Sequence, residues 1–156
     1  GDELCTNDND YQEFRKKIRT TRWADAFLNK PLAERQTIAQ GLRQESRETQ
    51  ANRAESISDA VESEILQWLQ QFSSTLLIHG HTHRPAVHCN AFGLRCVTSD
   101  WNISGIGVFV DTKNDMITVS LCHLSPDKTT VTEQWMRYAG TPEWKRNSSS
   151  DVSISV

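Results

Sequence analysis

Apolar side chains recur with two different spacings along the chain, and the spacing changes about halfway. In the first half the pattern is typical of amphipathic helices. Tyr11, Phe14 and Ile18 fall on one helical face, and either Asn7 or Asp8 can cap the helix that carries them. The sequence therefore predicts a helix through these three positions.

Three more helices are expected in the first half. The second ends near Asn29, and the third begins around Pro31, because proline suits the first turn of a helix. The fourth is expected to cover residues 55–72, with Ile57 and Phe72 among the apolar side chains that face inward.

From about residue 73 the pattern is that of β structure. The short apolar run Thr75–Ile78 is typical of a buried strand. The pair Asn114-Asp115 has the residue types of a hairpin turn. Further strands are expected at 85–90, 94–98, 105–110 and 116–122.

These patterns predict an α/β chain in three parts. Residues 1–72 form a helical part, and residues 73–124 form a β-rich part. Residues 125–156 end in a Ser-rich stretch without a core pattern, so we expect this tail to be loose.

Composition narrows the class of protein. The chain has 156 residues, 37% of them hydrophobic and 24% charged, which is ordinary for one globular domain. A net charge of −3 gives no reason to expect nucleic-acid binding. The four cysteines show no Cys-x-x-Cys spacing, so we interpret them as reduced thiols of a cytosolic protein, with a disulfide framework as the alternative.

Basic residues crowd the helical part, with acidic residues between them. One interpretation is a solvated helical surface. The other is a face for anionic lipid or phosphate, to which arginine forks are well suited. The basic residues are Arg15, Lys16, Lys17, Arg19, Arg22, Lys30, Arg35, Arg43, Arg47 and Arg53.

The strongest chemical signal is a cluster of histidines directly after the first predicted strand. His79, His81 and His83 alternate with other residues, and Gly80 allows an unusual backbone angle or a close approach. On an extended segment His81 and His83 would point to the same side, as a divalent metal requires. A hydrogen-bonded structural cluster is the alternative, and the second histidine could also donate to a phosphate oxygen.

The sequence Gly-His-Thr-His-Arg-Pro at 80–85 resembles the last motif of calcineurin-like metallophosphoesterases. The stretches at 1–15, 78–88 and 97–101 are similar to UDP-2,3-diacylglucosamine hydrolases, and the resemblance covers about residues 1–124. It implies the carboxyl-terminal part of a metallophosphoesterase β-sandwich flanked by helices. Residues 1–72 would then be a helical cap insertion and a connecting helix.

The resemblance also implies a reaction and a cofactor. The family cleaves the pyrophosphate of UDP-2,3-diacylglucosamine to 2,3-diacylglucosamine 1-phosphate and UMP in lipid A biosynthesis, using two metal ions, often Mn²⁺. On the family pattern His81 and His83 would each ligate one metal ion. His81 would also lie close to the substrate phosphate, as a catalytic and substrate-binding residue.

The cap would contribute further substrate contacts. Four candidates in the cap are separated by three, four and three residues, so they share one face if their helix is continuous. They are Arg43, Ser46, Gln50 and Arg53. Matching positions in the family imply that the substrate-binding residues of the cap are Asp8, Tyr11, Arg43, Ser46, Gln50 and Arg53. Asp100 and Trp101 are interpreted as structural.

The family's earlier ligand motifs, including Asp-x-His and Gly-Asn-His-Asp, are not found in this sequence. We therefore expect a fragment whose partner is the missing amino-terminal half of the enzyme, and which binds metal weakly and is inactive alone. The expected location is cytoplasmic, peripheral to the inner membrane. The alternatives are another metallophosphodiesterase of the superfamily, or a non-catalytic binding or assembly subunit that keeps the fold.

Overall fold

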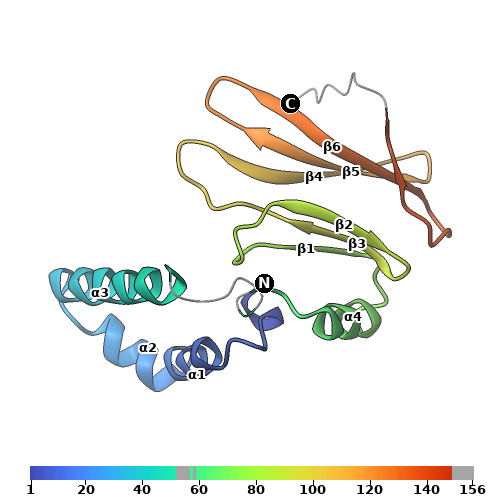
Figure 1. Cartoon of the computed structure of the whole chain (residues 1–156). Coiled ribbons are helices and arrows are strands. Elements are labelled where there is room, and N and C mark those ends of the chain that lie inside the picture. Colours follow the sequence, from blue (N-terminus) through green and yellow to red (C-terminus); the bar gives the residue numbers. More distant parts are fainter. Residues whose placement is uncertain (52–56, 58, 149–156) are drawn as a thin grey trace. The chain divides into compact units, whose positions relative to one another are not determined.

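The computed structural model describes residues 1–51, 57 and 59–148 (Figure 1). Within these residues the chain is an α/β protein with four α-helices and two β-sheets, which confirms the predicted α/β class. The chain forms two compact units. One comprises Glu3–Val61, and the other comprises Gly1–Asp2 together with Glu62–Val156.

The unit Glu3–Val61 is helical, as the apolar spacing predicts. Asp8 caps the first helix by accepting a hydrogen bond from the Tyr11 backbone N–H at 3.0 Å. Thr20 caps the second in the same way, and Asn29 ends it. The three helices are α1 (Asn9–Ile18), α2 (Thr21–Leu28) and α3 (Leu32–Ala51). A short 3-10 turn, η1 (Asp2–Leu4), precedes them.

The fourth helix is shorter than the sequence predicts. Helix α4 spans Glu62–Gln71, so the expected helix over 55–72 is wrong at its start. The backbone N–H of Val61 donates instead to the Leu4 carbonyl at 2.8 Å, which a helix continuing through Val61 would not allow. Ile57 lies in a turn and Phe72 lies beyond the last helical residue; both are exposed rather than inward-facing.

The first sheet contains three strands in the order β1-β3-β2. Strand β1 runs parallel to β3, and β2 runs antiparallel to it. The strands are β1 (Leu76–His79), β2 (Ala86–Asn90) and β3 (Gly93–Val97), close to their predicted positions.

The second sheet is an antiparallel array in the order β4-β5-β6-β7. Its first two strands form a hairpin in which Lys113 pairs with Met116, and Asn114 and Asp115 form the two-residue turn between them. Both turn residues have positive φ, 48° and 61°, as in the turns that match strand twist. The predicted hairpin is confirmed. The strands are β4 (Gly105–Lys113), β5 (Met116–Leu124), β6 (Thr129–Tyr138) and β7 (Lys145–Arg146).

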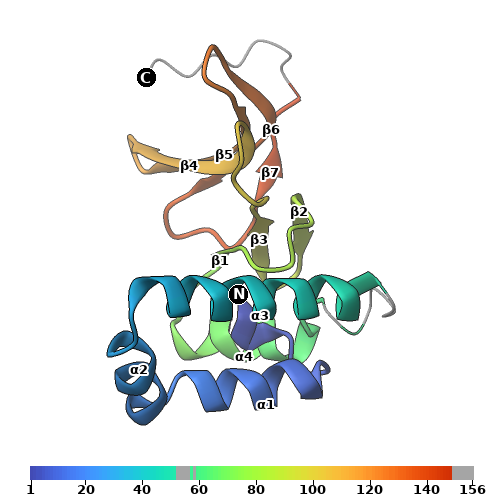
Figure 2. The same ribbon diagram turned by 90° about the vertical axis from the view of Figure 1, so that its left-hand side faces the viewer.

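The two sheets share one apolar core. Leu94 and Cys96 of the first sheet lie in a buried cluster with Val119 of the second sheet and Trp144. Helix α4 contacts β1 from the other side of the first sheet, so this sheet lies between α4 and the second sheet (Figures 1 and 2). Strand β3 is buried apart from the half-buried Arg95. The prediction of a buried strand at 75–78 is wrong for β1, because its leucines are half-buried and Ile78 is 41% exposed.

The expected loose tail is wrong for most of the described part of 125–156. Residues 129–138 pair along their length with β5, and residues 145–146 pair with β6. Trp144 is 8% exposed and belongs to the core. The ladder with β5 and the burial of this indole together hold the segment in place.

Candidate functional site

Strand β1 delivers its last residue, His79, to one end of the first sheet. The loop at 80–85, which we call the histidine loop, then connects β1 to β2 and contains His81 and His83. The parallel pairing of β1 with β3 continues to the pair His79 and Val97, so the loop begins where a fixed ladder ends.

The backbone of the histidine loop is not extended. His81 has φ 76° and His83 has φ 54°, and both angles lie in the left-handed region that non-glycine residues rarely adopt. The interpretation that alternation along an extended segment aligns the two imidazoles is therefore wrong. Backbone of this kind costs about 1–3 kcal/mol per residue and gathers at functional sites.

Gly80 has no positive φ, so its role is a close approach rather than an unusual backbone angle. A Cβ atom at this position would lie 3.2 Å from the Thr98 hydroxyl oxygen. A Cβ atom at Gly1, in the same compact unit, would collide with the Gly80 carbonyl oxygen. The chain is therefore closely approached at the beginning of the loop.

The two loop histidines present their imidazoles at the surface. His83 Nδ1 lies 3.9 Å from a carboxylate oxygen of Asp100, and both side chains are more than half exposed. This distance is longer than a hydrogen bond but within ion-pair range. A carboxylate beside Nδ1 leaves Nε2 of His83 as a ligand atom, an arrangement that is common around protein metal ions.

Thr82 lies between the two histidines and has an unusual environment. Its hydroxyl oxygen is buried and has no hydrogen-bond partner among the described residues. Such groups are few in folded proteins, and each leaves capacity for a ligand or a water molecule. The histidine loop thus combines two exposed imidazoles with an unused hydroxyl group.

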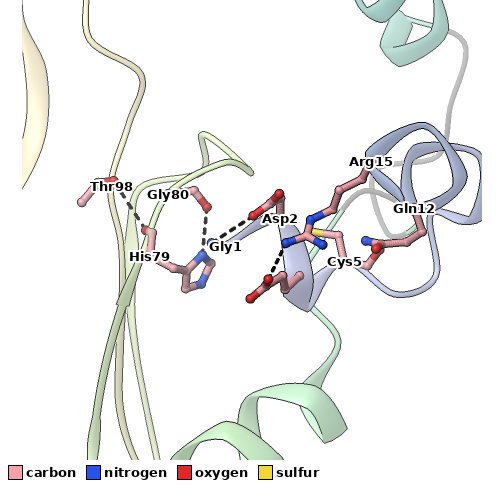
Figure 3. Close-up of polar contacts among 9 residues, drawn as sticks. Gly1, Asp2, Cys5, Gln12, Arg15, His79, Gly80 and Thr98 are labelled. Atoms are coloured by element: carbon pink, nitrogen blue, oxygen red, sulfur yellow. Dashed lines mark hydrogen bonds and ion pairs between the residues drawn. The ribbon is translucent and has the colours of Figure 1, made fainter. Parts of the chain in front are cut away.

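His79, at the start of the loop, is buried and hydrogen-bonded, and its partners are half-buried. His79 is 6% exposed; its Nδ1 lies 3.0 Å from the Gly80 carbonyl oxygen, and its Nε2 lies 3.3 Å from a guanidinium nitrogen of Arg95. The Thr98 N–H donates to the His79 carbonyl at 2.9 Å. Figure 3 shows His79 between Gly80 and Thr98.

The side chains present fit a metal site in part. Imidazoles are common ligands of divalent metal ions, and two of them lie in one short exposed loop. Within the chain that the structure describes, no group of three or more His, Cys, Asp or Glu side chains is placed to hold a metal ion. His81 and His83 therefore fit as two donors of a larger ligand set.

The candidate substrate-binding residues of the cap lie in the helical unit. Asp8 is buried at the cap of α1, and Tyr11 is half-buried in its first turn. Arg43 and Ser46 are exposed on α3, which continues unbroken through Gly41. Gln50 lies in the last turn of α3, and Arg53 lies outside the described residues. Their proposed contacts with substrate stay predictions.

Sequence reasoning missed the support behind the histidine loop. Arg95 and Thr98 hold His79, and Asp100 lies beside His83. One signal was present in the sequence, because Arg95 is a charged residue in the middle of an otherwise apolar strand. A charge in such a position is rare unless it is paired.

The fold and this loop define a class, an α/β protein with a histidine-rich loop after a parallel strand. The chain is 44% identical over 103 residues to a UDP-2,3-diacylglucosamine hydrolase of Chromobacterium violaceum, and 40% over 109 residues to one of Cellvibrio japonicus. These matches cover 65% and 67% of this chain, and 44% and 45% of the relatives.

A similarly named relative from Pectobacterium carotovorum is 34% identical over 118 residues, covering 73% of this chain and 49% of the relative. The predicted resemblance is confirmed. Over the portion that it shares with them, the chain is a homologue of UDP-2,3-diacylglucosamine hydrolases. The chain spans less than half the length of these relatives. No protein-family model matches it.

Among the described residues, no helix is long and apolar enough to cross a bilayer.

Proposed function

We propose that this chain contributes the histidine loop of a hydrolase that cleaves the pyrophosphate of UDP-2,3-diacylglucosamine in lipid A biosynthesis. The products would be 2,3-diacylglucosamine 1-phosphate and UMP. The observation that carries the proposal is the identity of 34–44% to curated enzymes of that name. The strained, exposed backbone at His81 and His83 supports it independently.

The proposed roles are those that the family resemblance implies for the loop residues. His81 and His83 would each hold one ion of a manganese pair, and His81 would lie against the substrate phosphate. When bound, such a pair supplies Lewis-acid chemistry to the phosphoryl group. Asp100 would fix the ring of His83, and the unused Thr82 hydroxyl is available to a phosphate oxygen or a water molecule.

The helical unit would act as the cap of the site, and the two sheets as part of a phosphoesterase β-sandwich. Arg43 is exposed on α3, where a guanidinium can bind a phosphate oxygen. Ser46 lies three residues further on, so the two side chains lie on neighbouring helix positions. Asp8, Tyr11, Gln50 and Arg53 would complete the contacts with the sugar and its acyl chains.

An enzyme with a lipid substrate acts at a membrane surface. We propose peripheral association with the inner membrane on its cytoplasmic side, through the basic residues of the helical unit. Complete activity would require ligands beyond His81 and His83, supplied by the kind of segment that makes up the rest of the relatives. The chain would then bind metal weakly and turn over no substrate alone.

Growth rescue tests the proposal. The chain replaces the matched portion of the C. violaceum enzyme, and this chimera is expressed in a bacterium depleted of its own UDP-2,3-diacylglucosamine hydrolase. We expect the chimera to restore growth, and the His83→Ala chimera to fail. His123→Ala is the matched control, because His123 is an exposed histidine on β5 outside the proposed site.

Two outcomes count against the proposal. Failure of a well-expressed, folded chimera to rescue would favour a non-catalytic binding subunit. Rescue that survives His83→Ala would remove the histidine loop from the reaction.

A further inference from the structure

The strand register places His79 and Arg95 on one face of the first sheet. In the β1–β3 ladder Leu77 pairs with Arg95, and His79 pairs with Val97. Leu94 and Cys96 point into the core that the two sheets share, so Arg95 points to the opposite face. His79 lies two residues along the strand from Leu77, on that same face, within reach of the Arg95 side chain.

The partners of His79 determine which of its ring nitrogens donates and which accepts. An arginine guanidinium has hydrogen-bond donors only, so Nε2 of His79 must accept from Arg95 across 3.3 Å. A ring that accepts at Nε2 has its N–H donor at Nδ1. That N–H donates to the Gly80 carbonyl oxygen at 3.0 Å. Both ring nitrogens of this buried histidine are therefore used in fixed roles.

The Gly80 carbonyl belongs to the first peptide group of the histidine loop. The Thr98 N–H holds the preceding carbonyl, that of His79, at 2.9 Å. Two consecutive carbonyl groups are thus fixed just before the chain enters the left-handed backbone of His81. A strained conformation persists only where the surrounding structure holds it.

We infer that His79 is a positioning residue, which transmits the fixed position of Arg95 to the histidine loop through the Gly80 carbonyl. The Nδ1–H donor, rather than the bulk of the ring, is the feature that matters. For metal binding the inference rests on the proposed function, because His81 and His83 are the donors that the loop would present.

Two substitutions separate the two ring nitrogens. In His79→Asn the amide group lies near the position of Nδ1 and can still donate to Gly80. In His79→Gln the amide group reaches the position of Nε2 and keeps only the contact with Arg95. Both variants replace the imidazole ring with an amide group. If His79 only filled space, the two variants would therefore change the histidine loop to a similar extent.

The first test uses the metal-free chain and NMR. In the wild type, nitrogen shifts should show that Nδ1 of His79 carries the N–H that donates to Gly80. Amide hydrogen exchange at residues 81–83 should rise about tenfold in His79→Gln and stay within about threefold of wild type in His79→Asn. A proton on Nε2 in the wild type, or equal exchange in the two variants, would overturn the inference. The wild-type measurement stands even if a variant does not fold.

The second test adds Mn²⁺ alone. Low concentrations should broaden the ring signals of His81 and His83, and His79→Gln should need about tenfold more Mn²⁺ than His79→Asn. Equal Mn²⁺ requirements would overturn the metal-binding part of the inference. If wild-type chain shows no selective broadening, the proposed metal site is wrong, and the exchange data still decide whether His79 holds the loop.

Discussion

The indole N–H of Trp144 donates to the backbone carbonyl of Thr75 at 3.0 Å, joining residues that are 69 positions apart. The same carbonyl accepts from the Leu94 N–H at 2.8 Å. Residue 75 directly precedes β1, so the segment after β6 fixes the beginning of the strand that leads to the histidine loop.

Replacing Trp144 should destabilise the β-rich unit strongly. Trp144→Ala removes a buried side chain from the shared core and should lower the free energy of unfolding by about 3–5 kcal/mol. Trp144→Phe keeps a ring but loses the N–H, so its cost should be nearer 1–2 kcal/mol. Urea denaturation followed by circular dichroism measures both. Equal costs for the two variants would show that burial of the ring contributes little.

Two glycines should respond to alanine in opposite directions. At Gly93, where φ is +150°, a Cβ atom would lie 2.8 Å from the Thr75 carbonyl carbon. Gly93→Ala should therefore cost more than about 2 kcal/mol. Gly41 lies in α3, and a Cβ atom there would have no neighbour within 4 Å. Gly41→Ala should stabilise α3 by up to about 1 kcal/mol.

Thermal unfolding of the two glycine variants beside the wild type provides the measurement. Each is the control for the other, because the chemical change is identical. A stable Gly93→Ala variant would contradict the close approach to Thr75.

The buried thiol of Cys96 should make stability fall at alkaline pH. Burial raises the pKa of Cys96 from 9.0 to about 12, and the nearby Glu133 carboxylate adds to the rise. Below pH 9 the thiol is protonated in both the folded and unfolded states. Between pH 9 and 12 the unfolded chain loses this proton while the folded chain keeps it, so the free energy of unfolding decreases as pH rises.

The Cys96→Val variant isolates this effect, because valine fills a similar volume and does not titrate. Urea denaturation at pH 8 and pH 10.5 should show a larger loss of stability in the wild type than in the variant. Equal losses would mean that other groups cause the alkaline destabilisation.

The sequence predicted the elements that local patterns determine. Strands β1 to β5 and helices α1 to α3 follow from apolar spacing, and the turn at Asn114 and Asp115 follows from residue type. The start of α4 was misplaced, because the competing partner of the Val61 N–H is the carbonyl of Leu4, 57 positions earlier. The spacing of apolar residues gives no information about that hydrogen bond.

Strand β6 was missed for a related reason. Its residues are mostly polar and half-buried, and the strand is held by its ladder with β5. The core side chain that anchors the following segment, Trp144, lies outside the strand itself. Trp144 is an isolated tryptophan in a polar stretch, and the sequence alone does not show which residues its ring will pack against.

The candidate site was likewise predicted only in part from the sequence. The residue types of the histidine loop, together with its place after a predicted strand, identified His81 and His83 as candidates. Their left-handed backbone and the supporting contacts of His79 depend on Arg95 and Thr98, which lie 16 and 19 positions further along the chain. Spacing along the sequence does not specify contacts of this kind.

The most direct test of the central claim is hydrolysis by the purified chimera. UDP-2,3-diacylglucosamine is incubated with the chimera and Mn²⁺, and phosphorus NMR follows the products. We predict UMP and 2,3-diacylglucosamine 1-phosphate, with the rate reduced at least about 100-fold in His83→Ala and unchanged in His123→Ala. No cleavage by a folded, Mn²⁺-loaded chimera, or cleavage that is indifferent to His83, would contradict the account.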